Sequence, residues 1–307
     1  MWKEVIRRLL LIIPVAVGVY TVVFLMIRIV PGDPVLALVE EGAMSADRME
    51  SIRHELGLDR PVYVQYFDYL VRLASFDLGV SFNTGQPVKK MILEALPYSL
   101  QLTAVAMFIA TVFGLLTGTL SAVRHNSWAD TAAMVLAVVG IAAPDFWLGL
   151  LLILVFVLRL GWFPLTEVGL SWNILLLPAV TLAVRPMASI ARLSRASCLE
   201  VLHECYVTTA RAKGLGERTV VLRHVVRNAL IPVTTIIGLD LGATISNAMV
   251  IEVVFARPGI GRIILVAIQH HDFPTIQATV TLSCIFYAVM NILVDLGYVA
   301  LDPRLRT

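Results

Sequence analysis

Long uncharged stretches alternate along the chain with shorter segments that carry most of the charges. Six stretches are mostly apolar; one is interrupted by Asp145, and two others contain a single interior charge. They are Leu9–Ile27, Leu96–Val123, Thr131–Pro144 continuing as Phe146–Leu158, Trp172–Ala191 (interior Arg185), Asn228–Ile251 (interior Asp240) and Phe273–Val294. About 20 helical residues cross the hydrocarbon core of a bilayer, whereas a barrel strand alternates over about ten. Because lipid cannot satisfy a bare backbone, the pattern predicts an all-α integral membrane protein with about six transmembrane helices.

Composition agrees with this pattern. Hydrophobic residues make up 58% of the chain and charged residues 15%, against about 45–50% and about 25% in soluble domains. The first run, Leu9–Ile27, exceeds the apolar core of a signal peptide, and no small-x-small cleavage site follows it. We therefore expect a retained first span. The net charge of +2 gives no indication of nucleic acid binding.

Basic residues predict the orientation, because Lys and Arg collect on cytoplasmic loops. With six alternating spans and the N-terminus inside, most Lys and Arg fall on inside segments once the long loop 31–95 is left out of the comparison. We therefore expect both termini to be cytoplasmic. The expected segments are an N-terminal transmembrane helix (1–30), an outside segment (31–95), a five-helix transmembrane domain (96–301) with an inside loop (193–227), and a cytoplasmic tail (302–307).

The outside segment shows helical periodicity. Apolar residues recur on one face at Met49, Ile52 and Leu56, and Gly57 can end that helix. Pro61 then stands at a plausible first helical position. The second predicted helix carries its apolar residues at Val62, Tyr66, Tyr69 and Leu73.

The inside loop contains the most specific motif. It reads Tyr206-Val-Thr-Thr-Ala-Arg-Ala-Lys-Gly214, then nine residues, then His224-Val-Val-Arg-Asn-Ala-Leu-Ile-Pro232. This resembles the EAA loop of ABC importer permeases, and more narrowly the B-type permease subunit of the dipeptide, oligopeptide and nickel permease family. Further motifs follow in that family's order: Pro31-Gly-Asp-Pro34, Leu56-Gly-Leu-Asp-Arg-Pro61, Pro144-Asp-Phe-Trp147, Phe255-Ala-Arg-Pro-Gly-Ile-Gly-Arg262 and Asp272-Phe-Pro274.

The resemblance implies a type I ABC importer permease in a bacterial or archaeal cytoplasmic membrane. It implies a peptide substrate, with nickel, glutathione or opine import as alternatives. The implied partners are a second permease subunit, two ATPase subunits at the cytoplasmic face and an extracytoplasmic substrate-binding protein. No G-x-x-x-x-G-K-[ST] motif occurs in the chain, so we expect no catalytic residue or cofactor here, with ATP and Mg on the ATPases.

A secondary transporter driven by an ion gradient is the alternative from another class. Such proteins often show two related halves, and no second half is visible in this sequence. The nickel alternative draws attention to His270-His271-Asp272. Neighbouring histidines on a helix point about 100° apart, so the motif favours a polar outside loop over a metal site.

The loop residues fit the implied role as the ATPase-coupling site. Small side chains allow a close approach to another surface, and a glycine permits the positive φ of a sharp bend. We therefore predict a coupling elbow at Ala210, Arg211, Ala212, Lys213 and Gly214. The alternative is an ordinary basic inside loop.

Three ionisable residues lie inside predicted spans, namely Asp145, Arg185 and Asp240. Each costs at least about 2.5–3.5 kcal/mol in a bilayer and usually faces a partner or a water-filled cavity. Two interpretations remain open. Asp240 and Arg185 form a structural ion pair, or all three residues line the translocation path.

Overall fold

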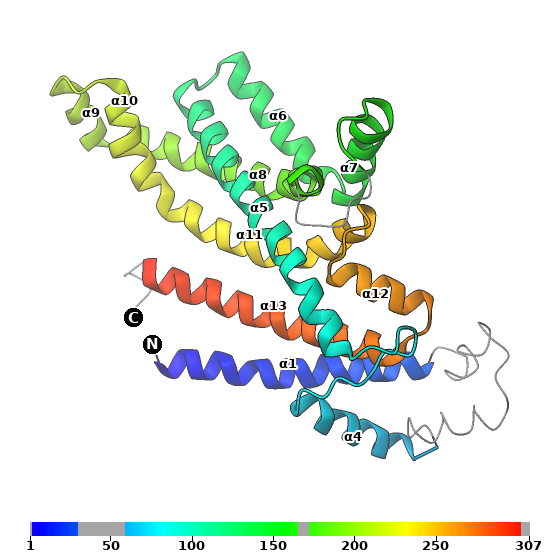
Figure 1. Cartoon of the computed structure of the whole chain (residues 1–307). Helices are drawn as coiled ribbons and strands as arrows, with labels where there is room; N and C mark the ends of the chain where they lie inside the picture. Colours follow the sequence, from blue (N-terminus) through cyan, green and yellow to red (C-terminus); the bar gives the residue numbers. More distant parts are fainter. Residues whose placement is uncertain (1, 30–58, 165–171, 302–307) are drawn as a thin grey trace. The chain divides into compact units, whose positions relative to one another are not determined.

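The computed structural model describes residues 2–29, 59–164 and 172–301 (Figure 1). Within these ranges all regular elements are helical, and the only strand-like feature is an isolated bridge between Val80 and Pro87. The chain divides into two compact units. The larger comprises residues 98–257 together with the C-terminal residues from Met290, and the smaller comprises residues 2–97 and 258–289. The all-α prediction is therefore confirmed for the described residues.

The larger unit is built around α8 (Trp172–Leu202). Within the apolar window of α8, 61% of the residues are buried, against 33% in the other long apolar helices. Helices α6, α7 and α11 all pack against it. The elements of this unit are α5 (Val88–Val123, from Tyr98), α6 (Trp128–Ala142), α7 (Asp145–Leu152), the π-helix η1 (Ile153–Arg159), α8, α9 (Cys205–Ala212), α10 (Glu217–Thr219), the π-helix η2 (Val220–Val226) and α11 (Arg227–Val254) (Figure 1).

Two glycines let α5 lie directly against α8. A Cβ atom on Gly114 would stand 2.8 Å from Ile190 Cγ2 and 2.9 Å from the Met187 carbonyl oxygen, and one on Gly118 would collide with the Ala191 carbonyl. Small residues four apart allow such backbone contact between membrane helices, where dispersion replaces the hydrophobic effect as the driving force.

A sharp break separates α6 from α7. The sequence predicts one span through Pro144, but the axes of the two helices are bent by 107°. Ala143 and Pro144 are both extended, with ψ of 131° and 132°. The residue before a proline is disfavoured in the α region, which explains where the helix stops. The consequence is that Asp145 begins a new helix instead of lying inside a continuous one.

The smaller unit contains α1 (Trp2–Ile29), α4 (Val62–Ala74), the first turns of α5, α12 (Ile260–Gln269) and most of α13 (Phe273–Leu301). Aromatic side chains join α1 to α4. The Tyr20 and Phe24 rings lie 5.3 and 5.2 Å from the Tyr66 ring, and Thr21 Oγ1 is 2.8 Å from the Tyr66 hydroxyl. The predicted helix after Pro61 is confirmed, although it begins at Val62, with Pro61 at the N-cap and not at the first helical position. Met49, Ile52, Leu56 and Gly57 lie outside the described residues.

Asp272 joins the outer loop to the start of α13 and is almost fully buried. It accepts hydrogen bonds from Ser81 Oγ at 2.5 Å, Phe82 N at 3.2 Å and Thr275 Oγ1 at 2.8 Å. Its carboxylate is thus the acceptor of a structural network within the smaller unit.

Four helices in the described residues are long and apolar enough to cross a membrane, or five if the bent pair α6–α7 counts as one span. Leu11–Met26 of α1 is a shorter apolar stretch. The predicted total of six spans, the cytoplasmic termini and the predicted segment boundaries remain predictions.

Candidate functional site

The inside loop forms a tight elbow between α9 and α10. Gly214 has φ +79°, its N–H donates to the Arg211 carbonyl at 2.9 Å, and the Leu215 N–H donates to the Ala210 carbonyl at 3.3 Å. These two bonds form a Schellman motif, which ends a helix at a left-handed residue. The positive φ predicted for Gly214 is therefore present, and it fixes the bend.

One face of α9 is anchored within the larger unit. Val207 and Ala210 are buried in a cluster with Cys198 of α8 and Val220 and Val225 of η2. The other face is open: Tyr206, Thr208, Thr209, Ala212 and Lys213 are exposed. Figure 1 shows α9 and α10 together at one end of the larger unit. The elbow is thus a supported helix that presents a free face.

An ion pair closes the elbow. Arg211 Nε and Nη2 donate to the two carboxylate oxygens of Glu217 at 3.1 and 2.7 Å. The hydrogen bonds to Glu217 raise the pKa of the Arg211 guanidinium. Both side chains are exposed, so the pair stabilises the fold only slightly. Its bidentate geometry instead fixes the orientation of α10 against α9.

The predicted coupling residues therefore fall into four groups. Ala210 is buried and supports the elbow, Arg211 bridges its two arms, and Gly214 makes the turn. Ala212 and Lys213 are exposed, so within this chain only Ala210 packs closely against a neighbour.

The charged residues Asp145, Arg185 and Asp240 come from three helices that pack against one another, namely α7, α8 and α11. Arg185 is exposed, and both aspartates are half-buried. None of the three forms an ion pair within the described chain, and Asp145 Oδ1 and Asp240 Oδ2 are buried without a hydrogen-bond partner there.

A close contact between the three helices lies one turn from two of these residues, Asp145 and Arg185. A Cβ on Gly149 would lie 3.4 Å from Thr181 of α8 and 3.3 Å from Val254 of α11, so the three helices nearly touch at this glycine. Residues four apart share a helix face. Asp145 precedes Gly149 by four residues and Arg185 follows Thr181 by four, so both lie one turn beyond the contact on the faces that meet there.

Comparison with known proteins decides the family. The family described as "Binding-protein-dependent transport system inner membrane component" matches residues 110–307, and its N-terminal domain matches residues 1–103. The chain belongs to this family. The protein is therefore the permease component of an ABC importer, and it has multiple membrane-spanning helices.

Relatives and solved structures agree. The permease is 40% identical over 306 residues to the glutathione transport system permease protein GsiC of Escherichia coli O6:H1, covering 100% of this chain and 99% of the relative. It is 39% identical over 309 residues to a protein of Brucella abortus (strain 2308) named for a peptide transport system permease, covering 98% of each chain.

Two solved transporters share the fold. The MetNI methionine ABC transporter, in an inward facing conformation, matches with a TM-score of 0.56 at 18% identity over 70% of this chain and 98% of that chain. An amino acid ABC transporter with histidines matches with a TM-score of 0.53 at 16% identity over 70% and 94%. The type I permease fold predicted from the sequence is therefore confirmed.

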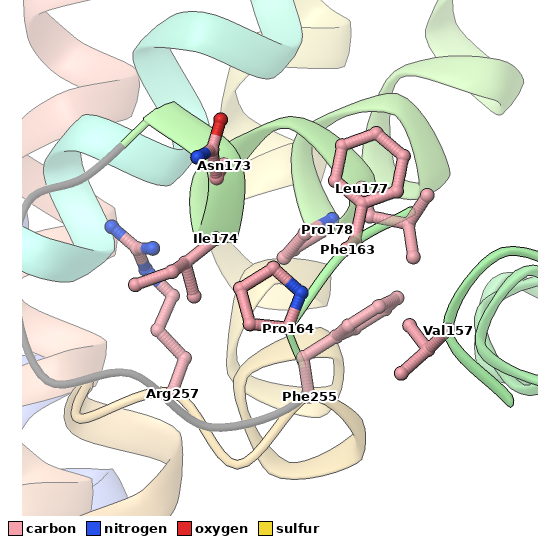
Figure 2. A pocket seen from close by; sticks show the side chains of 9 residues that line it. All are labelled: Val157, Phe163, Pro164, Asn173, Ile174, Leu177, Pro178, Phe255 and Arg257. Carbon is pink, nitrogen blue, oxygen red and sulfur yellow. The ribbon is translucent and has the colours of Figure 1, made fainter. Parts of the chain in front are cut away.

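A small pocket is lined by residues of η1 and α8 and by residues that follow η1 and α11 (Figure 2). Its lining residues are Val157, Phe163, Pro164, Asn173, Ile174, Leu177, Pro178, Phe255 and Arg257. The buried Arg257 side chain donates to Gln101 Oε1 at 2.8 Å. The cavity volume of about 10 Å³ holds about one water molecule. This pocket is therefore too small to be the cargo site of the permease.

Sequence reasoning missed a buried ion pair between the start of α6 and the C-terminal part of α8, beside the C-terminal end of α5. Arg195 Nε and Nη2 donate to the Asp130 carboxylate at 2.6 and 2.8 Å, and Ser121 Oγ donates to the same carboxylate at 2.6 Å. A local signal for it was present. Ser127-x-x-Asp130 has the spacing of a helix-capping box, and Ser127 Oγ does accept from the Asp130 N–H.

Proposed function

We propose that this permease forms one half of an importer pore for small peptides in a bacterial cytoplasmic membrane. Two of its relatives are named for glutathione and peptide transport, and glutathione is itself a small peptide. The cargo arrives on an outside binding protein, passes between this permease and a second one, and is released inside.

ATP hydrolysis takes place on two partner subunits, which bind ATP and Mg. The permease takes up their movement through the free face of α9. That face carries Tyr206 and Lys213, which are exposed, whereas the opposite face is packed on α8 and η2. A helix that is packed on one side and exposed on the other can dock in a groove on a neighbouring subunit. It can then transmit a displacement of that subunit without deforming.

The observation that supports this role best is the Schellman turn at Gly214. The turn needs φ +79°, which is costly for a β-branched residue. We expect Gly214→Val to change the angle between α9 and α10 at a cost of about 1–3 kcal/mol. The complex should still insert, but substrate-loaded binding protein should no longer stimulate ATP hydrolysis.

Gly216, two residues further on, is a matched control. It has φ −61°, and a Cβ atom on either glycine would meet nothing within 4 Å. Gly216→Val should therefore retain stimulated hydrolysis and uptake, and Gly214→Asn should retain most of both because Asn tolerates a positive φ. Full uptake by Gly214→Val, or equal loss in both valine variants, would show that the elbow does not couple the permease to the ATPases.

A further inference from the structure

We propose that α4 is an interfacial helix, and that Tyr63, Phe67 and Val71 insert into the lipid at the membrane surface where α13 begins. In the orientation predicted from the basic loops, this is the outer surface of the membrane. The inference goes beyond the proposed function, because it assigns a lipid contact to a segment that the sequence predicts only as an outside helix.

One face of α4 is packed within the smaller unit. The Tyr69 ring stacks on the Tyr20 ring of α1, with the ring centres 6.1 Å apart. Leu73, one turn further along, packs against the buried apolar cluster that joins the outer loop to α5 and α13. These contacts fix the rotation of α4 about its own axis, and they thereby decide which side chains it turns away from the protein.

The face turned away is apolar. Tyr63, Phe67 and Val71 are 67%, 60% and 67% exposed, and residues four apart form one stripe along a helix. The charged residues Asp68 and Arg72 lie on a different side, turned about 100° and 140° from Phe67 at 3.6 residues per turn. A helix surrounded by water would carry polar residues on its exposed stripe. A charged side next to a broad apolar one is instead typical of a helix that lies in a membrane interface.

Contacts with α1 place α4 beside the end of that helix (Figure 1). Tyr20 Oη donates to the Tyr66 carbonyl at 3.2 Å, and Arg28 donates to Gln65 Oε1. The stretch of α1 from Tyr20 to Arg28 is about 12 Å long, and its Met26 is likewise apolar and exposed. The helix α4 therefore lies beside the last turns of the apolar run of α1 and not beyond them.

The start of α13 indicates the same depth. Tyr69 Oη donates to the Pro274 carbonyl at 3.4 Å. Pro274 is the second residue of the stretch Phe273–Ile292, which is long and apolar enough to cross a membrane. A span begins near the boundary between headgroups and acyl chains, where tyrosine is enriched. Since α4 lies at this boundary, lipid is the occupant that fits its exposed stripe.

The test measures what surrounds this stripe in the permease, purified with the subunits that copurify in nanodiscs of phosphatidylcholine and phosphatidylglycerol. A nitroxide is attached through p-acetylphenylalanine in place of Phe67, which leaves the free cysteines unlabelled. Power-saturation EPR compares collisions of the label with oxygen, which concentrates among acyl chains, and with a nickel chelate, which stays in water. Oxygen should relax the label at Phe67 more strongly than the nickel chelate does. A label at the neighbouring Asp68, which is 53% exposed, is the matched control and should show the reverse order.

The other outcomes at Phe67 overturn the proposal, and each indicates a different occupant. Stronger relaxation by the nickel chelate means that the stripe faces water. Weak relaxation by both agents means that protein covers it. If oxygen relaxes the label strongly but loses this effect when substrate-loaded binding protein is added, the stripe receives the binding protein.

A second variant controls for disturbance by the label. Phe67→Trp keeps an aromatic ring at the position, and its emission in excess of the wild type should be quenched by phosphatidylcholine brominated on the acyl chains. Iodide in the buffer should not quench it. Asp68→Trp should respond in the opposite way. Quenching of Phe67→Trp by iodide, or by neither agent, would show that the stripe does not contact lipid.

Discussion

The aspartates of the larger unit differ in the hydrogen-bond partners of their carboxylates. Asp130 accepts hydrogen bonds from Arg195, Ser121 and the Asn126 N–H, and its side chain is 3% exposed. Asp145 and Asp240 each keep one buried oxygen without a partner in the described part of the chain. The same residue type therefore serves as a structural anchor in α6, and in α7 and α11 it stays a candidate for the lining of the translocation path.

Removing the charge of Asp130 should destabilise the packing of α6 against α8 beside the C-terminal end of α5. We expect Asp130→Asn to leave Arg195 without its carboxylate and to cost about 3 kcal/mol, the usual loss when one partner of a buried pair is removed. The apparent melting temperature of the purified complex measures this. Asp130→Asn combined with Arg195→Gln should recover part of the loss.

The exposed ion pair between Lys90 and Glu94 is a control for the buried Asp130–Arg195 pair. Lys90 Nζ lies 3.8 Å from Glu94 Oε1, and both side chains are more than 60% exposed. Lys90→Gln should cost less than about 0.5 kcal/mol. If Asp130→Asn and Lys90→Gln lower the melting temperature equally, the buried Asp130–Arg195 pair stabilises the fold no more than an exposed pair does.

At the scale of elements, the start of α13 depends on a side chain from the loop before it. Asp272 caps this helix and also accepts from Ser81 of the outer loop. Asp272→Ala should cost about 2–3 kcal/mol, because it removes a helix cap and leaves the buried Ser81 hydroxyl without its acceptor. Asp272→Asn keeps a carbonyl acceptor and should cost clearly less. Proteolysis of the outer loop in membranes reports the change, and equal protection in both variants would contradict the capping role.

The helices of the larger unit could be predicted from their apolar runs. The change of direction between α6 and α7 could not. The run through Thr131 and Leu158 indicates a single span, and Pro144 predicts a kink of unknown size. The observed 107° bend depends on α7 packing against α8 and α11 at Gly149, and these are tertiary contacts that periodicity does not contain. The elbow was more predictable, because the positive φ of Gly214 is a local property of the glycine.

The three charges predicted to line the translocation path illustrate the same limit at the level of side chains. The sequence places Asp145, Arg185 and Asp240 inside spans, since charges in apolar runs are easily seen. Whether they pair depends on the rotation of three helices about their axes. Asp130 and Arg195 are 65 residues apart, so their contact was equally invisible, although the capping pattern at Ser127 could have placed Asp130 in the first turn of a helix.

For the whole molecule, orientation in the membrane is the main prediction still to be tested. Basic residues of the loop before α11 and at the C-terminus predict that both lie in the cytoplasm. A green fluorescent protein fused after Thr307 should fluoresce, and alkaline phosphatase at the same position should be inactive. Alkaline phosphatase inserted at Gly161, between η1 and α8, should be active. Activity at Thr307 would require an odd number of spans.

The helical run from Glu217 to Val254 is unbroken over 38 residues, because η2 joins α10 to α11 without a loop. Asp240 stands 23 residues along this run, about 35 Å from Glu217 at 1.5 Å per residue. The run is therefore a continuous rod, with the elbow between α9 and α10 at one end and the half-buried Asp240 side chain part-way along it. A shift of α10 along the helix axis displaces Asp240 as well. Bending of the helix at Pro232 reduces the size of that displacement. A displacement of α10 can therefore reach Asp240 through one continuous helical run, with no relay of side chains between them.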